Sequence, residues 1–302
     1  DLQRWQEFLY DDKGRTLAER SLDVTTAAVQ QQTTRIYGAS GNGEGLLESV
    51  TQEDVLTPAN NQSTSYFYDS AGRVIKTQKS SLLGSCQFTY TIFDDAGNAL
   101  RSVCSTQNLM SPETADTDED TKVTTYEYDP LGRRIKTTVN AGAAYAQSTL
   151  TVYDALDRVI RTIANYVADV GITDPYIEDR DNFNHGADNT QNLVTDTAYN
   201  ARGMVRQQTD VLGNVTLYGY DEAGRLIKTV QSASVPTYNN DYSGGSPDPS
   251  LSEYEVSSAP DKDIVTTQRY DAAGNLVKTE SYLSETVKNT TYTVYDALNR
   301  PV

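Results

Sequence analysis

Residues 65–79 read Ser-Tyr-Phe-Tyr-Asp-Ser-Ala-Gly-Arg-Val-Ile-Lys-Thr-Gln-Lys, which is a turn signal between two strand-forming runs. Asp69 suits the first position of a type I turn, because its carboxylate can accept backbone N–H bonds. Gly72, three residues later, can take the left-handed conformation that ends a three-residue hairpin loop with a bulge. Aromatic and β-branched residues on both sides of the turn favour strands. The stretch therefore predicts a β-hairpin.

The same turn recurs along the whole chain, which makes it a repeat. Its substitutions obey the turn chemistry: Pro130 stands where a type I turn favours proline, and Asp157 and Asn299 replace glycine with residues that tolerate a positive φ. The pattern predicts a positive φ for Gly14, Gly72, Gly132, Gly203, Gly224 and Gly274. The complete copies are Tyr10-Asp11 with Gly14-Arg15, Tyr68-Asp69 with Gly72-Arg73, Tyr128-Asp129 with Gly132-Arg133, and Tyr220-Asp221 with Gly224-Arg225. Other copies start at Phe93, Tyr153, Tyr199, Tyr270 and Tyr295, and a decayed copy starts at Tyr37.

A Tyr-Asp-x-x-Gly-Arg turn followed by an apolar pair and a basic residue with threonine resembles the YD repeats, also called Rhs repeats. Such repeats occur in bacterial Rhs polymorphic toxins, in the B and C subunits of insecticidal toxin complexes, and in teneurins. The resemblance covers nearly the full length and implies a long sheet wound into a hollow shell. We therefore expect an all-β fold of tandem hairpins that form a continuous, coiled antiparallel sheet, the wall of a shell or tube.

Residues 1–302 are expected to form a single YD-repeat array, because stacked hairpins share one continuous core. The chain starts abruptly at Asp1 and stops just after a turn, as expected for a segment of a longer protein. A second turn signal, Asp210 with Gly213, predicts a chain reversal at the opposite sheet edge. Insertions of loop composition, which on repeat scaffolds often carry binding, lie near residues 40–65, 105–121, 163–194 and 232–263.

Pairing outward from the turn without a shift would place Tyr68 opposite Arg73 and Phe67 opposite Val74. Tyr66 would then lie opposite Ile75. This register predicts a ladder of tyrosine and isoleucine on one face and of valine and leucine on the other.

The composition excludes several kinds of partner. The net charge is −17, whereas nucleic acids and anionic membrane surfaces require basic patches. No apolar run approaches the roughly 20 residues that cross a bilayer. A mean hydropathy of −0.57 and 21 tyrosines suit a thin sheet wetted on both faces. We expect an extracellular or cell-surface protein, and the resemblance points to a bacterial source.

Cys86 and Cys104 flank the same turn. If Phe93 and Asn98 pair across it, the two cysteines face each other on adjacent strands within the one-residue shift of a bulge. We expect their Cα atoms to lie within about 7 Å of each other. A disulfide in an oxidising compartment and two small buried thiols are both compatible with this spacing.

Catalytic and cofactor signals are sparse. His185, the sole histidine, stands in a polar insertion, and we expect a solvated loop residue rather than a catalytic base. The turn aspartates are expected to bind turn N–H groups. Asp129-Pro130-Leu131-Gly132 resembles the aspartyl self-cleavage motif of Rhs proteins, but it stands in register as an ordinary repeat turn. The sequence thus predicts no enzyme and no cofactor.

Calcium is the one metal hypothesis. Asp116, Asp118 and Asp120 occupy positions 1, 3 and 5 of a potential calcium loop, and Glu127 occupies position 12. Thr121 stands at position 6, where such loops require glycine, so a solvated acidic loop is the favoured interpretation.

The expected function is that of a non-catalytic scaffold: a wall segment of a secreted or surface YD-repeat assembly, either a toxin-encapsulating shell or an extracellular filament. Its partners would be neighbouring repeats of the same chain or adjacent copies added strand to strand. An encapsulated polypeptide is a further partner of a shell. The alternative is a glycan-binding adhesion module that uses tyrosine-rich faces and insertion loops on cell-surface glycans.

Overall fold

A computed structural model of the chain describes residues 4–23, 28–54, 61–80, 86–168, 174, 180–186, 190–233, 263–282 and 287–302. The regular structure in these residues is β-strand, apart from single 3-10 turns at Gly41–Gly43 and Arg180–Asn182. The predicted all-β class is confirmed. The chain divides into two compact units, Asp1–Ser148 and Thr149–Val302, which are described separately.

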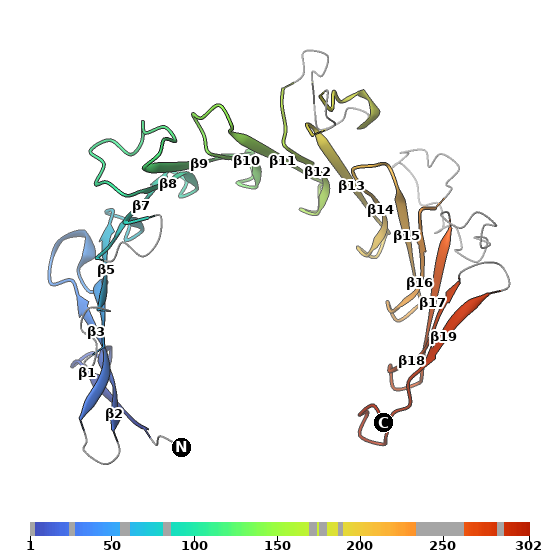
Figure 1. Cartoon of the computed structure of the whole chain (residues 1–302), viewed down its shortest axis with the longest axis horizontal. Coiled ribbons are helices and arrows are strands. Elements are labelled where there is room, and N and C mark those ends of the chain that lie inside the picture. The colour runs from blue at the N-terminus through green and yellow to red at the C-terminus, as the bar shows by residue number, and fades with distance from the viewer. Residues whose placement is uncertain are drawn as a thin grey trace. The chain divides into compact units, whose positions relative to one another are not determined.

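The first unit is an antiparallel meander in which each strand pairs with the next one along the chain. Figure 1 shows these strands following one another from blue to green. They are β1 (Arg4–Tyr10), β2 (Thr16–Asp23), β3 (Val29–Tyr37), β4 (Leu47–Asp54), β5 (Gln62–Tyr68), β6 (Val74–Lys79), β7 (Phe88–Phe93), β8 (Ala99–Ser105), β9 (Thr121–Tyr128) and β10 (Arg134–Val139).

The second unit repeats this arrangement, again with antiparallel pairing of consecutive strands. The reversal predicted at Asp210 is confirmed: Gly213 has φ 84° and its N–H donates to the Asp210 carbonyl at 3.0 Å, between β14 and β15. The strands are β11 (Gln147–Tyr153), β12 (Val159–Ala164), β13 (Leu193–Tyr199), β14 (Val205–Thr209), β15 (Val215–Tyr220), β16 (Leu226–Gln231), β17 (Ile264–Tyr270), β18 (Leu276–Tyr282) and β19 (Lys288–Tyr292).

The register across the turns differs from the expected one. Tyr68 pairs with Val74, Phe67 pairs with Lys76, and the register shifts between these two pairs. The predicted pairings of Tyr68 with Arg73, Phe67 with Val74 and Tyr66 with Ile75 are therefore wrong. The physical reason is a β-bulge, in which Ile75 is the extra residue and Arg73 belongs to the turn. The same shift occurs beside the Tyr-Asp turns of β1/β2, β7/β8, β15/β16 and β17/β18.

Because of the bulge, the expected tyrosine–isoleucine and valine–leucine ladders do not form. One row of paired residues instead crosses β5 to β9 in the order Phe67, Lys76, Tyr90, Val103 and Val123. Val103 and Val123 are fully buried at the far end of this row, while Phe67 is 43% exposed at its near end. The row thus runs from a covered core to an open surface.

Two buried clusters lie under the insertions at 105–121 and 163–194, whereas the insertion predicted near 40–65 contains strand β4 and is not a loop throughout. In the first unit, Leu109 and Ala115 of the 105–121 insertion pack on a buried cluster of Phe88, Tyr90, Val103 and Val123. In the second unit, Phe183 of the 163–194 insertion, only 4% exposed, joins Leu150, Ile163 and Val194. A further cluster consists of Leu217, Val230 and Val265. Most of the 232–263 insertion lies outside the described residues. Insertions that bury apolar side chains give a single sheet the cover that it otherwise lacks.

Candidate functional site: the ladder of tyrosine-aspartate turns

Each Tyr-Asp turn is closed by its own aspartate. Asp69 Oδ1 accepts the N–H groups of Ala71 and Arg73, both at 2.9 Å, and Oδ2 accepts Arg73 Nε at 2.6 Å. The Gly72 N–H donates to the Asp69 carbonyl at 3.0 Å. Asp129 and Asp221 bind the arginines of their own turns in the same way. One carboxylate thus binds both the loop backbone and the arginine side chain.

These bonds keep the turn carboxyls ionised. The pKa of Asp69 lies below its usual value because the backbone N–H of Arg73 donates to the carboxylate, which outweighs partial desolvation, and because the Arg73 guanidinium and the Ala71 N–H donate as well. The pKa of Asp94 is lowered first by the side-chain amide of Asn98 and then by its backbone N–H. A carboxylate with a lowered pKa that is already hydrogen-bonded is poorly suited to act as a general acid.

The left-handed position of each turn is filled as the sequence predicts. Gly72, Gly132 and Gly224 have φ of 76°, 78° and 82°, and Gly14, Gly203 and Gly274 are also positive. Asp157 and Asn299, which replace glycine in two copies, have φ of 62° and 58°. The Asp129-Pro130-Leu131-Gly132 segment has ordinary turn bonds, with the Gly132 N–H donating to the Asp129 carbonyl at 2.9 Å.

Seven tyrosine hydroxyls each connect a hairpin to the preceding one. In every case the acceptor is the backbone carbonyl of the first strand residue after the preceding turn, so each bond joins neighbouring repeats. In the first unit the pairs are Tyr37 with Thr16 (3.2 Å), Tyr68 with Leu47 (2.6 Å) and Tyr128 with Ala99 (2.9 Å). In the second unit they are Tyr199 with Val159 (3.0 Å), Tyr220 with Val205 (2.9 Å), Tyr270 with Leu226 (2.9 Å) and Tyr295 with Leu276 (3.3 Å).

The turn arginines make the connection in the opposite direction. Four turn guanidinium groups are bound to the aspartate of their own turn and also lie over the aromatic ring that begins the next turn, where a cation–π contact contributes about 0.5–1 kcal/mol at exposed sites. Arg15 Nη1 also donates to the Gly45 carbonyl at 2.8 Å in the next hairpin's loop. Measured from the guanidinium carbon to the ring centroid, the contacts are Arg15 over Tyr37 (4.2 Å), Arg73 over Phe93 (4.6 Å), Arg158 over Tyr199 (4.5 Å) and Arg225 over Tyr270 (4.8 Å).

We call this set of aspartate, tyrosine and arginine contacts the turn ladder. Its tyrosine hydroxyls, guanidinium groups and carboxylates are already engaged within the chain, so the arrangement joins hairpins rather than presenting reactive groups. His185, half-buried in the 163–194 insertion, places Nδ1 3.2 Å from the Gln191 carbonyl oxygen. Neither the turn ladder nor the His185 contact places a nucleophile beside a general base.

The four carboxylates of the calcium hypothesis do not converge. Asp118 Oδ1 accepts the N–H groups of Asp120 and Thr121, and the Asp120 carboxylate accepts bonds from Thr106 and Gln107. Glu127 lies in β9 and pairs with Lys136 at 2.8 Å. Asp116 lies beside Gly142. Across the described parts of the chain, no group of three acidic, histidine or cysteine side chains is placed to hold a metal ion. In the described residues the spacing does not bring the four carboxylates together, because strand β9 carries Glu127 away from the loop.

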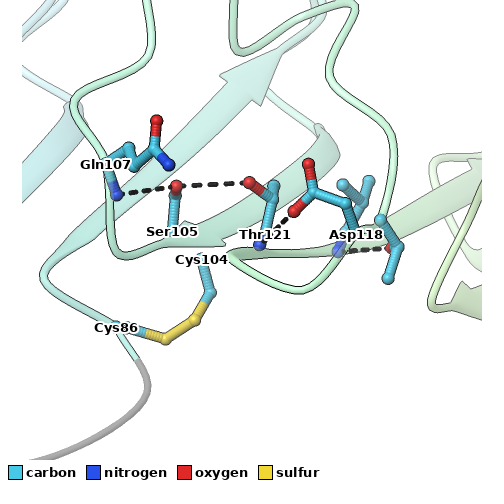
Figure 2. The surroundings of a disulfide bond; sticks show 8 residues. Cys86, Cys104, Ser105, Gln107, Asp118 and Thr121 are labelled. Atoms are coloured by element: carbon cyan, nitrogen blue, oxygen red, sulfur yellow. Dashed lines mark hydrogen bonds between the residues drawn. A yellow bond between two sulfur atoms is a disulfide. The ribbon is translucent and has the colours of Figure 1, made fainter.

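The two cysteines form a disulfide with a Cα–Cα distance of 5.2 Å. Figure 2 shows the bridge beside the start of the 105–121 insertion. Cys104 lies in β8 opposite Thr89, and Cys86 precedes β7, so the two cysteines do not face each other on adjacent strands as the spacing suggested, although their Cα atoms lie within the expected distance. The buried Ser105 hydroxyl lies 3.2 Å from that of Thr121 and accepts the Gln107 N–H at 3.0 Å. The disulfide thus joins Cys86, which precedes β7, to the end of β8, next to the hydrogen bonds of Ser105 at the start of the 105–121 insertion.

Sequence reasoning did not single out a second cluster, around Lys76. Its Nζ lies 4.9 Å from the ring centroid of Phe67, 5.2 Å from that of Phe88 and 5.6 Å from that of Tyr90. It donates to Asn108 Oδ1 at 2.8 Å. The period-2 alternation of large side chains at Phe88, Tyr90 and Ile92 is the signal that could have identified this face.

Comparison with known proteins agrees with the repeat. A family model described as RHS Repeat matches residues 113–144 and 199–234, which include the turns at Asp129 and Asp221. The two matched segments are therefore Rhs repeats, and the turn ladder has the same form in both units. A comparison of the sequence with curated proteins finds no match.

The fold is similar to that of solved toxin-complex structures. Crystal structures of TcdB2-TccC3-TEV and TcdB2-TccC3-Cdc42 each match with a TM-score of 0.59, at 14% and 15% identity, over 98% of this chain and 13% of theirs. The crystal structure of TcdB2-TccC3 matches with a TM-score of 0.55 at 15% identity, over 100% of this chain and 14% of that one. At this identity the likeness concerns the fold alone, and the chain spans about an eighth of those proteins.

Proposed function

We propose that this chain is a wall segment of a larger secreted or surface assembly, in which a YD-repeat sheet encloses a polypeptide. The observation that carries the proposal is the turn ladder, because its polar side chains join each hairpin to the next and build an extended sheet. Stability in such an array comes from nearest-neighbour contacts rather than from one central core.

Two further observations support a wall. The described cores are small clusters under insertions, and most strand residues are only partly buried. The similar TcdB2-TccC3 structures contain this fold within a chain several times longer. Among the described residues, no helix is long and apolar enough to cross a membrane. The partners that fit this proposal are neighbouring repeats, in the same polypeptide or in an adjacent copy, and the polypeptide inside.

Protease protection in the natural full-length protein tests enclosure. The protein is digested in its native state, and the polypeptide encoded with these repeats is followed by mass spectrometry. We expect that polypeptide to resist digestion in the intact protein and to be cut rapidly when expressed alone.

A matched pair of variants connects protection to the turn ladder. Gly224→Val strains a turn, whereas Gly224→Asn keeps a residue type that the chain itself uses at this position in Asn299. Enclosure predicts that the valine variant loses protection and the asparagine variant retains it. Equal digestion of the enclosed and the isolated polypeptide would reject enclosure. Long polymers in electron micrographs would instead favour the filament.

A glycan-binding module is the second candidate, and one groove favours it. Tyr66, Phe67 and Tyr68 line a groove of about 450 Å³ together with Asn42 and Glu48. The Tyr68 hydroxyl is bound to the Leu47 carbonyl, so this residue would offer a sugar its ring face only. Glycan-array binding that is lost on Phe67→Ala and kept on Tyr292→Ala would support this function, and an array without signal would reject it.

A further inference from the structure

Strands β5, β6 and β7 carry a second groove, lined mainly by Phe67, Ile75, Ile92, Phe93 and Pro112. Its volume of about 490 Å³ falls within the roughly 300–1,000 Å³ of small-molecule sites. Phe67 and Ile75 are 43% and 37% exposed. The groove therefore offers a wide apolar wall that is open to solvent.

The groove lies where the cover of the neighbouring core ends. Over β7 to β9, the 105–121 insertion covers the face with Leu109 and Ala115. At the groove, the same insertion contributes Pro112 to the rim. The row that contains the buried Val103 continues through Tyr90 and Lys76 to Phe67. An apolar ligand in the groove would thus pack next to the buried cluster that contains Tyr90 and Val103.

The charges in the groove indicate which ligand fits. Asp69, Arg73 and Lys76 line it, and Arg73 Nε bonds to Asp69 at 2.6 Å, so these two neutralise each other. The Arg73 guanidinium also makes a cation–π contact with the Phe93 ring. Lys76 Nζ binds the neutral Asn108 side chain and three aromatic rings, and it forms no ion pair with any of the described residues. In a chain of net charge −17, the groove keeps one uncompensated positive charge.

We propose that this groove binds an amphipathic carboxylate, with its aromatic or branched aliphatic body against Phe67, Ile75 and Ile92 and its carboxylate on Lys76 Nζ. An ammonium has three donors, and Asn108 uses one of them. A carboxylate would accept charge-assisted bonds from the others. A neutral apolar ligand would cover those donors without replacing their bonds to water, which is unfavourable.

The test uses the whole chain and two probes that share one apolar body. Hydrocinnamate carries a carboxylate, and hydrocinnamyl alcohol carries a neutral hydroxyl in its place. Binding is followed by calorimetry and by NMR shifts at two ionic strengths. We expect hydrocinnamate to bind about tenfold more tightly than the alcohol, because only the carboxylate accepts charge-assisted hydrogen bonds from the ammonium. Added salt should reduce that preference.

Variants separate the charge from the apolar wall. Lys76→Met keeps a long apolar stem, and it should remove the preference for hydrocinnamate without weakening the binding of the alcohol. Phe67→Ala should weaken both probes. Lys79→Met, on the same strand, is the control and should change neither. The proposal is overturned if hydrocinnamate shows no binding at roughly 10 mM, if the alcohol binds equally well to the unmodified chain, or if Lys79→Met has the effect expected of Lys76→Met. The comparison of probes on the unmodified chain decides the matter even if a variant fails to fold.

Discussion

The guanidinium carbon of Arg225 lies 4.8 Å from the ring centroid of Tyr270, and the Tyr270 hydroxyl donates to the carbonyl of Leu226, the residue after that arginine, at 2.9 Å. Two contacts of opposite direction thus join the same pair of hairpins. Arg225 also bonds to Asp221 of its own turn. Loop closure within one repeat and docking of the next repeat therefore depend on the same side chain.

Gly224→Val should destabilise the chain by about 1–2 kcal/mol, because Gly224 has φ 82° and β-branched residues are strained in this conformation. A Cβ at this position would lie 3.5 Å from the Met204 sulfur, an ordinary contact, so the cost is conformational rather than steric. Urea unfolding measures this loss in the free energy of unfolding. Gly224→Asn is the matched control and should lower the free energy of unfolding by less. Equal losses for both variants would show that the positive φ at this position does not set the effect of the valine.

Tyr220→Phe should lower the free energy of unfolding by about 0.5–1.5 kcal/mol, since it removes the hydroxyl that donates to the Val205 carbonyl at 2.9 Å. The ring itself should be accommodated, because Phe93 occupies the equivalent position of another repeat. Tyr218→Phe is the control: its hydroxyl binds the Gln208 side chain at an exposed position, where water can replace it. If both variants unfold at the same urea concentration, the hydroxyl ladder contributes nothing to stability.

The turns were predictable from sequence because their chemistry is local. Asp69, Gly72 and Arg73 form a loop whose bonds lie within five residues, so residue types and spacing were sufficient to predict it. The bulge at Ile75 was not predictable from sequence. The register with the bulge and the register without it both pair strand-forming residues, and the turn bonds decide between them. A one-residue shift then changes which side chains share a face.

The contacts between repeats and insertions depend on long-range packing. Phe183 stands in a polar stretch and resembles an isolated loop aromatic, yet it is 4% exposed against Ile163 and Val194. The Lys76 cluster likewise needs Phe67, Phe88 and Asn108 from three separate segments. Only the alternation around Tyr90 marked that face in the sequence.

Reduction of the Cys86–Cys104 disulfide should weaken the first unit. Replacing both cysteines with serine should lower the free energy of unfolding by about 2–4 kcal/mol, for a bridge between residues separated by 18 positions. Mass spectrometry after alkylation gives the direct measurement, with two labels expected after reduction and none before. A reductant should not change the stability of the double serine variant. Two labels on the native, unreduced protein would show free thiols instead.

Acid should destabilise the array through the turn aspartates. The pKa of Asp221 lies below its usual value because the Arg225 backbone N–H donates to the carboxylate, which outweighs desolvation, and because the Arg225 side chain donates and carries a positive charge. The unfolded chain, with an aspartate pKa of about 3.9, therefore takes up protons first as the pH falls. The unfolded state is favoured progressively below about pH 5, so this stabilisation is complete above that range and is lost as the pH falls through the lower folded pKa.

Asp221→Asn isolates that contribution. Asn200 already holds the equivalent position in another turn, where its Oδ1 accepts the N–H groups of Arg202 and Met204 at 3.0 Å each. Asparagine thus keeps the backbone bonds of the loop but cannot titrate. We expect the variant to be less stable than the parent at neutral pH, because the charged pair with Arg225 is lost, and to lose less stability on acidification. Urea unfolding midpoints between about pH 6 and pH 3 measure both curves, and parallel curves would show that Asp221 has the same pKa in the folded and unfolded chains.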